Sequence, residues 1–174
     1  MLPKYESVCY ELLRPEQVKE IKEKCPIAYI TVGSLEWHSL QNPLGTDSLK
    51  AHAVCCEAAL KYGGVVLPPY YQGLTRDWGP EDWYGYTLSI LGTDEFEAMM
   101  LKVAQALVQA GWKVIVGVTG HDVGRQRDAM ARAIDAATRE TDAVGFALME
   151  GELHEVNDEI PFAMDHAAAW ETSV

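Results

Sequence analysis

The sequence at residues 27–38 is I-A-Y-I-T-V-G-S-L-E-W-H. Its first six residues are apolar or β-branched, do not alternate with charged side chains, and stop at Gly33. A short, continuously apolar run of this kind is typical of a strand that is buried on both faces. Glu36 and His38 follow just beyond the carboxyl end of this strand. The stretch therefore predicts a buried strand with chemically active side chains at its end.

Helical and apolar segments alternate on both sides of this stretch. We expect further strands at residues 65–67, 87–91, 114–118 and 144–149, and helices at residues 15–24, 48–62, 93–110 and 125–139. Thr93 is expected to be the N-cap of the third helix. Alternation of helices with buried strands predicts a single domain over residues 1–174, an α/β fold that forms a three-layer α/β/α sandwich with a mainly parallel sheet. Ligands of such sheets bind at the carboxyl ends of the strands.

Composition narrows the class of protein. The chain has 174 residues, 48% of them hydrophobic, and a formal net charge of −12. This charge disfavours nucleic acid and anionic membranes as partners. The sequence shows no signal peptide and no apolar run of about 18 residues. We therefore expect a cytoplasmic protein, in which Cys9, Cys25, Cys55 and Cys56 are reduced thiols.

Carboxylates and histidines gather after the predicted strands, whereas His52 and His154 do not stand out in this way. Carboxylates and imidazoles without cysteine suit a divalent ion such as Zn²⁺, Mn²⁺ or Fe²⁺. Two residues that are two positions apart in extended backbone point the same way, and an aspartate at the start of the next helix can fold back towards them. The residues concerned are Glu36, His38 and Asp47 after the first strand, His121 and Asp122 after the fourth, and Asp165, His166 and Glu171 after the last.

Each of these motifs alone also has an ordinary structural interpretation. Glu36-x-His38 could form a surface hydrogen bond, and Asp47 could be a helix N-cap. Gly120-His121-Asp122 could be a plain turn, and His166 could be a capping or buried histidine. Their shared position at strand ends favours a metal centre over these alternatives.

Three ordered motifs resemble those of the creatininase (creatinine amidohydrolase) family. The first is Glu36-x-His38 with Asp47 eleven positions after Glu36. The second is Gly120-His121, and the third is D-H-A-A-A-W-E-T-S at residues 165–173. Residues 10–21 and 83–90 are also similar to stretches of the family, so that the resemblance extends over essentially the whole chain.

The resemblance implies two divalent metal ions, with zinc, manganese or iron as the candidates. Glu36, Asp47 and His121 would bind one ion, and His38, Asp47 and Glu171 the other, with Asp47 bridging. Glu171 is chosen because creatininase has its further carboxylate at the position of Val123, which cannot bind a metal. Glu171 is preferred over Asp122, the neighbour of Val123, as this ligand.

The activity that this resemblance implies is hydrolysis, by a metal-activated water, of a non-peptide C–N bond in a small-molecule substrate, an amide that is often cyclic. His166 would protonate the departing nitrogen, with Glu171 also at the catalytic centre. There are two alternatives. One is hydrolysis of a C–C bond in a cyclic ketone, and the other is a metal-binding or regulatory role without turnover. The residues expected to contact substrate are Trp78, Trp83, Tyr84, Asp122 and Asp165, although the aromatic ones could instead pack a long loop or a subunit contact.

Departures from the family pattern concern the pocket and the end of the chain. Ser39-Leu40-Gln41, Asp122-Val123-Gly124 and Ala168 replace residues usual in the family, which disfavours creatinine itself as the substrate. The chain is shortened at its C-terminus relative to the family, as a short variant or as a fragment. Apolar surface left open in this way, and the oligomeric habit of the family, predict a homo-oligomer.

Overall fold

The computed structural model describes residues 3–75, 86–88 and 90–153, and helices alternate with strands along them. The elements are η1 (Pro3–Tyr5), η2 (Tyr10–Leu12), α1 (Pro15–Lys24), β1 (Ile27–Val32), α2 (Thr46–Tyr62), β2 (Val65–Val66), α3 (Thr93–Gln109), β3 (Val114–Thr119), α4 (Gly124–Thr138), β4 (Val144–Met149) and η4 (Glu150–Leu153). Three short 3₁₀ helices occur among these residues, two before α1 and one directly after β4.

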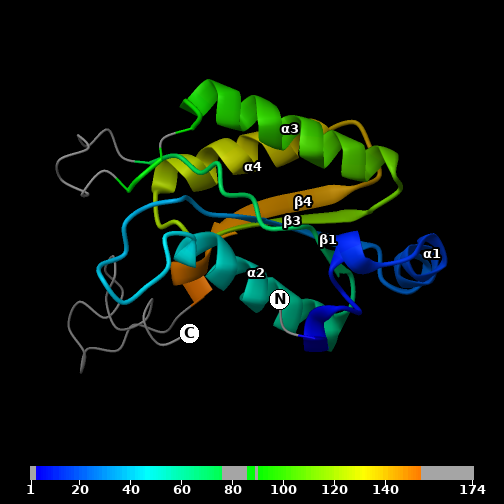
Figure 1. The fold of residues 1–174 in the computed structure, drawn as a ribbon. Coiled ribbons are helices and arrows are strands. Elements are labelled where there is room, and N and C mark those ends of the chain that lie inside the picture. Colours follow the sequence, from blue (N-terminus) through cyan, green and yellow to red (C-terminus); the bar gives the residue numbers. More distant parts are fainter. Residues whose placement is uncertain (1–2, 76–85, 89, 154–174) are drawn as a thin grey trace.

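The four strands form one parallel sheet in the order β2-β1-β3-β4. Helix α2 lies on one face, and α3 and α4 lie together on the other (Figure 1). The predicted α/β fold with a parallel sheet between helical layers is thus confirmed. The chain leaves β1 towards β2 but leaves β3 towards β4, so the strand order reverses between β1 and β3. The carboxyl ends of these two central strands are the place where a doubly wound sheet binds its ligand.

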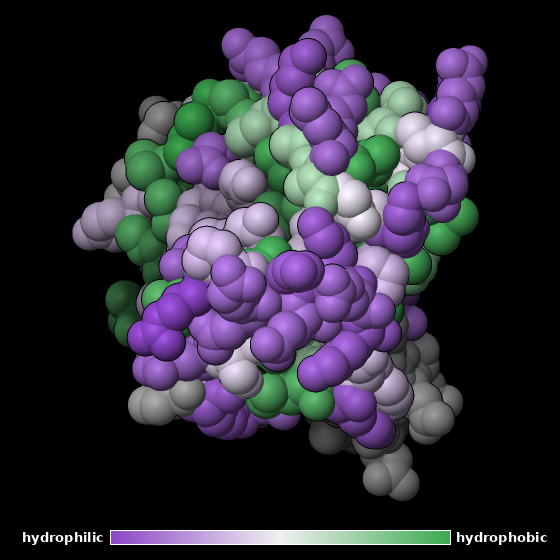
Figure 2. Space-filling model, turned by 90° about the vertical axis from the view of Figure 1, so that its right-hand side faces the viewer, coloured by the Kyte–Doolittle hydropathy of each residue, from purple (hydrophilic) through white to green (hydrophobic). Residues whose placement is uncertain are grey.

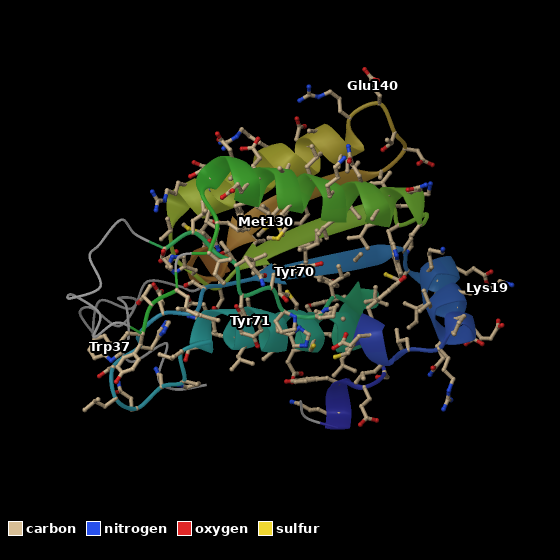
Figure 3. The ribbon with its side chains drawn as sticks, turned by 45° about the horizontal axis from the view of Figure 1, so that its top comes forward. Lys19, Trp37, Tyr70, Tyr71, Met130 and Glu140 are labelled. Carbon is tan, nitrogen blue, oxygen red and sulfur yellow. The ribbon has the colours of Figure 1, made fainter. Side chains whose placement is uncertain are left out.

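Apolar side chains fill both sides of the sheet. On the side of α3 and α4, Ile30 packs with Phe96 and Met100, which have no exposed surface. Met130 reaches from α4 towards the sheet (Figure 3), and its sulfur lies only 2.2 Å from the point where a Cβ atom would stand on Gly117. A side chain at residue 117 would therefore displace the Met130 and Ile134 side chains that fill this space.

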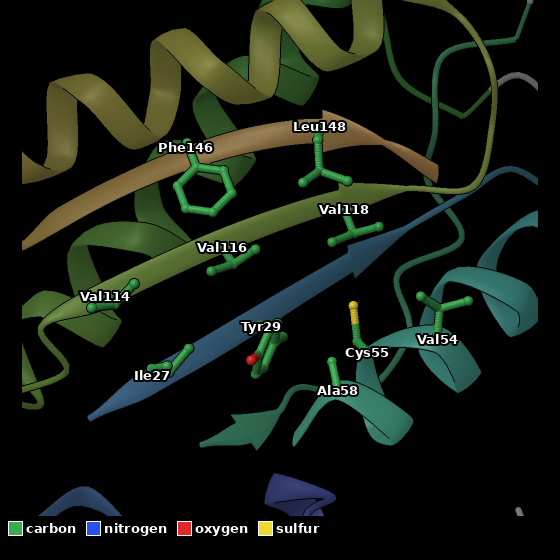
Figure 4. A pocket seen from close by; sticks show the side chains of 10 residues that line it. All are labelled: Ile27, Tyr29, Val54, Cys55, Ala58, Val114, Val116, Val118, Phe146 and Leu148. Atoms are coloured by element: carbon green, nitrogen blue, oxygen red, sulfur yellow. The ribbon is translucent and has the colours of Figure 1, made fainter. Parts of the chain in front are cut away.

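On the side of α2, the helix covers β1 and β2 more fully than β4. An apolar cavity of about 380 Å³ remains between α2 and the strands β1, β3 and β4 (Figure 4). Phe146 on β4 lies in its wall and is 52% exposed. The lining residues are Ile27, Tyr29, Val54, Cys55, Ala58, Val114, Val116, Val118, Phe146 and Leu148.

Most predicted elements occur where the sequence places them. Residues 15–24, 27–32 and 144–149 match their elements end to end, and α2 begins two residues earlier than expected. The prediction that Thr93 is an N-cap is wrong. Gly92 is the N-cap of α3, and its backbone N–H donates to Oε2 of Glu95 at 2.9 Å, so Thr93 is already helical.

The strand expected at residues 87–91 is also not formed among the residues described there. Leu88 makes a single antiparallel bridge to Leu35, in which its N–H donates to the Leu35 carbonyl at 2.8 Å. The β-forming side chains of this segment meet a loop instead of a sheet edge, so pairing does not extend.

The two ends of the strands differ in character. The amino ends face α1, where the surface is largely hydrophilic (Figure 2). Lys19 of α1 and Trp37, in the loop after β1, lie at opposite ends of the molecule (Figure 3).

None of the helices in the described part of the chain combines the length and the apolar character that a membrane span requires.

Candidate metal centre

Four side chains predicted to bind metal meet at the carboxyl ends of β1 and β3. Glu36 and His38 lie in the loop after β1, Asp47 lies in the first turn of α2, and His121 follows β3. All four are buried, with at most 6% of each residue exposed. A surface hydrogen bond between Glu36 and His38 is therefore excluded.

The nitrogen and oxygen atoms of these side chains are within contact distance. Nε2 of His38 lies 2.7 Å from Oδ1 of Asp47. Nδ1 of His121 lies 2.8 Å from Oε1 of Glu36 and 3.2 Å from Oδ2 of Asp47. Asp47 thus faces both imidazoles, each through a different oxygen, which is the arrangement required of a bridging carboxylate.

Backbone carbonyl groups fix the tautomer of both imidazoles. Nδ1 of His38 lies 3.0 Å from the carbonyl oxygen of Glu36, and Nε2 of His121 lies 2.8 Å from that of Leu74. A carbonyl oxygen only accepts hydrogen bonds, so these two nitrogens carry the proton. In a neutral ring the other nitrogen then holds a lone pair, and in both histidines it is the nitrogen that faces the carboxylates. Metal-binding histidines are oriented in this way.

The pKa values of His121 and Asp47 show that this cluster favours a positive charge. Burial disfavours a charge on His121, but hydrogen bonds and attraction from Asp47 and Glu36 outweigh it and raise its pKa to about 10. Burial likewise opposes the charge on Asp47, and hydrogen bonds from His121 and His38 overcome this and hold its pKa well below its usual range. The two carboxylates therefore require a buried positive charge, which a proton or a metal cation can supply.

Two glycines and a serine hold Asp47 in place. A Cβ atom on Gly33 would stand 2.3 Å from the backbone nitrogen of Ser48, and one on Gly120 would stand 2.1 Å from the carbonyl oxygen of Asp47. Only glycine therefore lets β1 and β3 approach the first turn of α2 so closely. The Ser34 hydroxyl donates to Oδ2 of Asp47 at 2.8 Å. The N-cap interpretation of Asp47 is wrong, because Gly45 is the N-cap of α2.

Gln126 of α4 holds the backbone of Leu74, whose carbonyl oxygen orients His121. Its side-chain oxygen accepts from the Leu74 backbone N–H at 2.5 Å, and its nitrogen donates to the Thr119 hydroxyl at 2.6 Å. No pattern in the sequence points to the roles of Ser34, Leu74 and Gln126. The role of Leu74 belongs to its backbone, which no residue type reveals.

The remaining predicted site residues are less fully placed. Asp122 is exposed beside the buried His121. Several lie outside the described residues, so their predicted roles in substrate contact, proton transfer and second-site binding stay predictions. These residues are Trp78, Trp83, Tyr84, Asp165, His166 and Glu171.

Comparisons with known proteins place the fold and the family. The family model for creatininase, described as creatinine amidohydrolase, matches residues 11–174. A solved creatinine amidohydrolase (creatininase) superposes with a TM-score of 0.78 at 23% identity. An Mn form of creatininase gives 0.76 at 20% identity, and a Zn–Zn form of a creatininase variant gives 0.77 at 21% identity.

Each of these superpositions covers 95% of this chain and 70% of the other. At such identities the structural likeness shows the fold, while the family assignment comes from the sequence match. A search of curated protein sequences gave no match.

Proposed function

Because the chain belongs to the creatininase (creatinine amidohydrolase) family, with a match over residues 11–174, we propose that it is a metal-dependent hydrolase of a small molecule. The bond cleaved is a non-peptide C–N bond, in an amide that is often cyclic. The metal centre is the cluster of Glu36, His38, Asp47 and His121.

The orientation of the two imidazoles carries this proposal. Each ring donates through one nitrogen to a backbone carbonyl and turns its second nitrogen towards a carboxylate. Once a cation displaces the extra proton of His121, two neutral imidazoles and two carboxylates form a set of lone pairs that can bind metal ions. No sulfur belongs to the set, and such donors suit Zn²⁺, Mn²⁺ or Fe²⁺.

The donors divide between two ions. Glu36, Asp47 and His121 would hold the first, since Nδ1 of His121 lies beside an oxygen of each carboxylate. His38 and the other oxygen of Asp47 would hold the second, with Glu171 as the proposed third ligand. The solved creatininases named above include an Mn form and a Zn–Zn form, which supports divalent ions in the family.

When bound, a divalent ion lowers the pKa of water towards about 7 and polarises a carbonyl oxygen. The residues of the chain create the conditions for this chemistry. Burial of all four side chains keeps the local dielectric low, which strengthens their interaction with charge. The carbonyls of Glu36 and Leu74 prevent the imidazoles from turning. His166 is proposed to protonate the departing nitrogen, because an amide nitrogen leaves poorly as an anion.

The proposal can be tested by reconstitution. Metal-free protein is loaded with Zn²⁺ or Mn²⁺, and the loss of cyclic amides from a panel is followed by mass spectrometry. Hydrolysis is expected only in the loaded protein and is expected to be lost in Glu36→Gln. Asp142→Asn is the matched control, because Asp142 is an exposed carboxylate that pairs with Lys113 at 2.7 Å.

Other outcomes would decide against the proposal. Metal binding without hydrolysis of any carbonyl substrate would favour a regulatory or metal-binding role. Cleavage of a C–C bond in cyclic ketones, without cleavage of amides, would favour the other hydrolytic alternative. Equal activity before and after removal of metal would exclude a metal-dependent hydrolase.

A further inference from the structure

A second buried cluster lies apart from the carboxylate centre and joins the start of the chain to α2. It consists of Cys9, His52 and Cys56, of which the cysteines have no exposed surface and the histidine is 7% exposed. His52 and Cys56 are four residues apart on α2 and therefore share one face of the helix. Cys9 lies just before η2, where its segment is fixed by the hydrogen bond of the Val66 N–H to the Val8 carbonyl at 2.8 Å.

The three potential ligand atoms are separated by nearly equal distances. The two sulfur atoms are 3.9 Å apart, and Nε2 of His52 lies 3.7 Å from the sulfur of Cys9 and 3.5 Å from that of Cys56. With Zn–S bonds of about 2.3 Å and Zn–N bonds of about 2.0–2.1 Å, a tetrahedral zinc site has S–S edges of about 3.8 Å and S–N edges of about 3.6 Å. Each observed distance agrees with its edge to within about 0.2 Å.

Packing in the protein core explains this arrangement less well than a metal site does. Nδ1 of His52 is buried and has no hydrogen bond of good geometry to the described residues, although the Leu67 backbone lies near enough to favour a proton on the ring. Buried imidazoles that serve only packing generally satisfy their ring nitrogens. Here the two sulfur atoms are the contacts that set the orientation of the ring, and a neutral Nε2 accepts a hydrogen bond from only one thiol at a time.

We propose that Cys9, His52 and Cys56 bind a zinc ion. Two thiolates and one imidazole select Zn²⁺ over harder ions such as Mn²⁺, whereas the carboxylate centre suits either. The ion would fasten the segment around Cys9 to α2. This site does not depend on the hydrolytic activity, since it shares no side chain with the first cluster.

Cobalt distinguishes the two centres. Protein is produced with Co²⁺ in place of Zn²⁺ during expression, so that the ion is available while the chain folds. Thiolate ligands give a sulfur-to-cobalt charge-transfer absorption in the near ultraviolet, which carboxylates and imidazoles do not give. The band is expected in the wild type and is expected to be lost in Cys9→Ser and Cys56→Ser, together with about one equivalent of cobalt.

Two control variants keep this test decisive. Cys55 is the buried neighbour of Cys56, but its side chain belongs to the cavity beside the sheet (Figure 4), so Cys55→Ser is expected to retain the band. Cys25→Ser, at the end of α1, serves the same purpose at a half-buried position. Cobalt-loaded wild type without the band would overturn the proposal. A disulfide between Cys9 and Cys56 in freshly purified protein, seen as a loss of two hydrogens without metal, would overturn it as well.

Discussion

Asp47 lies 2.7 Å from His38 through Oδ1, although the two residues come from a helix and from the loop that precedes it. Its second oxygen lies 3.2 Å from Nδ1 of His121 at the end of another strand. The same carboxylate therefore joins ligands from both central strands. Changes that move Asp47 should affect the whole centre, whereas changes at its edge should affect one ion.

The choice of Glu171 as second-site ligand gives the first prediction. Glu171→Gln should lower the bound metal from about two equivalents to about one and abolish hydrolysis, because His38 and Asp47 alone leave an ion weakly held. Asp122→Asn should keep both ions, since that side chain is exposed beside the centre. Metal analysis after gel filtration measures this. Equal metal content in Glu171→Gln and wild type would exclude Glu171 as a ligand.

The close approach of Gly120 to Asp47 gives the second prediction. Gly120→Ala places a methyl group 2.1 Å from the Asp47 carbonyl oxygen, so the first turn of α2 must move. We expect a loss of about 1–3 kcal/mol in the free energy of unfolding, with weaker metal binding. Gly124→Ala is the matched control, because no atom lies within 4 Å of a Cβ atom at that glycine. Similar effects of both variants would contradict the steric argument.

A substitution at Gln126 tests whether the hydrogen bonds that orient His121 contribute to metal affinity. Gln126→Leu leaves the buried Leu74 N–H without its acceptor, at a cost of about 1–3 kcal/mol in urea unfolding. Loss of this hydrogen bond also lets the Leu74 backbone shift, and its carbonyl is the acceptor that orients His121, so metal affinity should fall about 10- to 100-fold. Gln105→Leu, on the exposed surface of α3, should change neither quantity appreciably. Unchanged metal affinity in Gln126→Leu would show that His121 holds its orientation unaided.

Tyr29 makes stability depend on alkaline pH. Burial raises the pKa of its phenol above the ordinary value of 10.0. Above about pH 10 the unfolded chain releases this proton more readily than the native protein, so the native state binds more protons and stability falls as pH rises. Tyr29→Phe should show a shallower fall than wild type in unfolding curves measured from about pH 8 upwards. The difference between the two proteins at the lower pH measures the loss of the hydroxyl group alone, and a constant difference across the range would refute the prediction.

Assembly through the open side of the sheet is the fifth prediction. Phe146 lies in the wall of the apolar cavity (Figure 4), and it and Val144, two residues earlier on β4, each expose more than half of their surface. We expect a homo-oligomer that buries this face, and Phe146→Lys should shift it towards monomer in light scattering. Leu40→Lys is the control, because Leu40 is 96% exposed in the loop after β1. A monomeric wild type at micromolar concentration would contradict the prediction.

The sequence is informative where local signals and tertiary structure agree. Residues 27–32 form a continuously apolar run that ends in glycine, and the strand has those bounds. Residues 87–91 have similar strand-forming character, but among the described residues of this segment only Leu88 forms a bridge, and its partner Leu35 lies in a loop. Strand propensity describes a fit to a pleated surface, and that surface exists only once the chain has folded.

The same limit applies to the two clusters. Glu36, His38, Asp47 and His121 could be named because each follows a strand or begins a helix, and their convergence follows from the topology. His52 and Cys56 have a helical spacing that could have drawn notice, but Cys9 joins them only through packing of the segment near η2. Support from the Leu74 carbonyl also has no signal in the sequence, since every residue carries the same group.

The position of the candidate metal centre between β1 and β3 has a thermodynamic consequence. Its proposed ligands come from segments 74 to 85 residues apart in the sequence (121 − 47 and 121 − 36), so an unfolded chain holds them together only at a considerable loss of conformational entropy. An ion in this centre is then a ligand of the native state alone, and it acts as a reversible cross-link. Each tenfold rise in free metal above the dissociation constant adds about 1.4 kcal/mol to the stability of the fold. Metal supply would in this way regulate the lifetime of the protein as well as its chemistry.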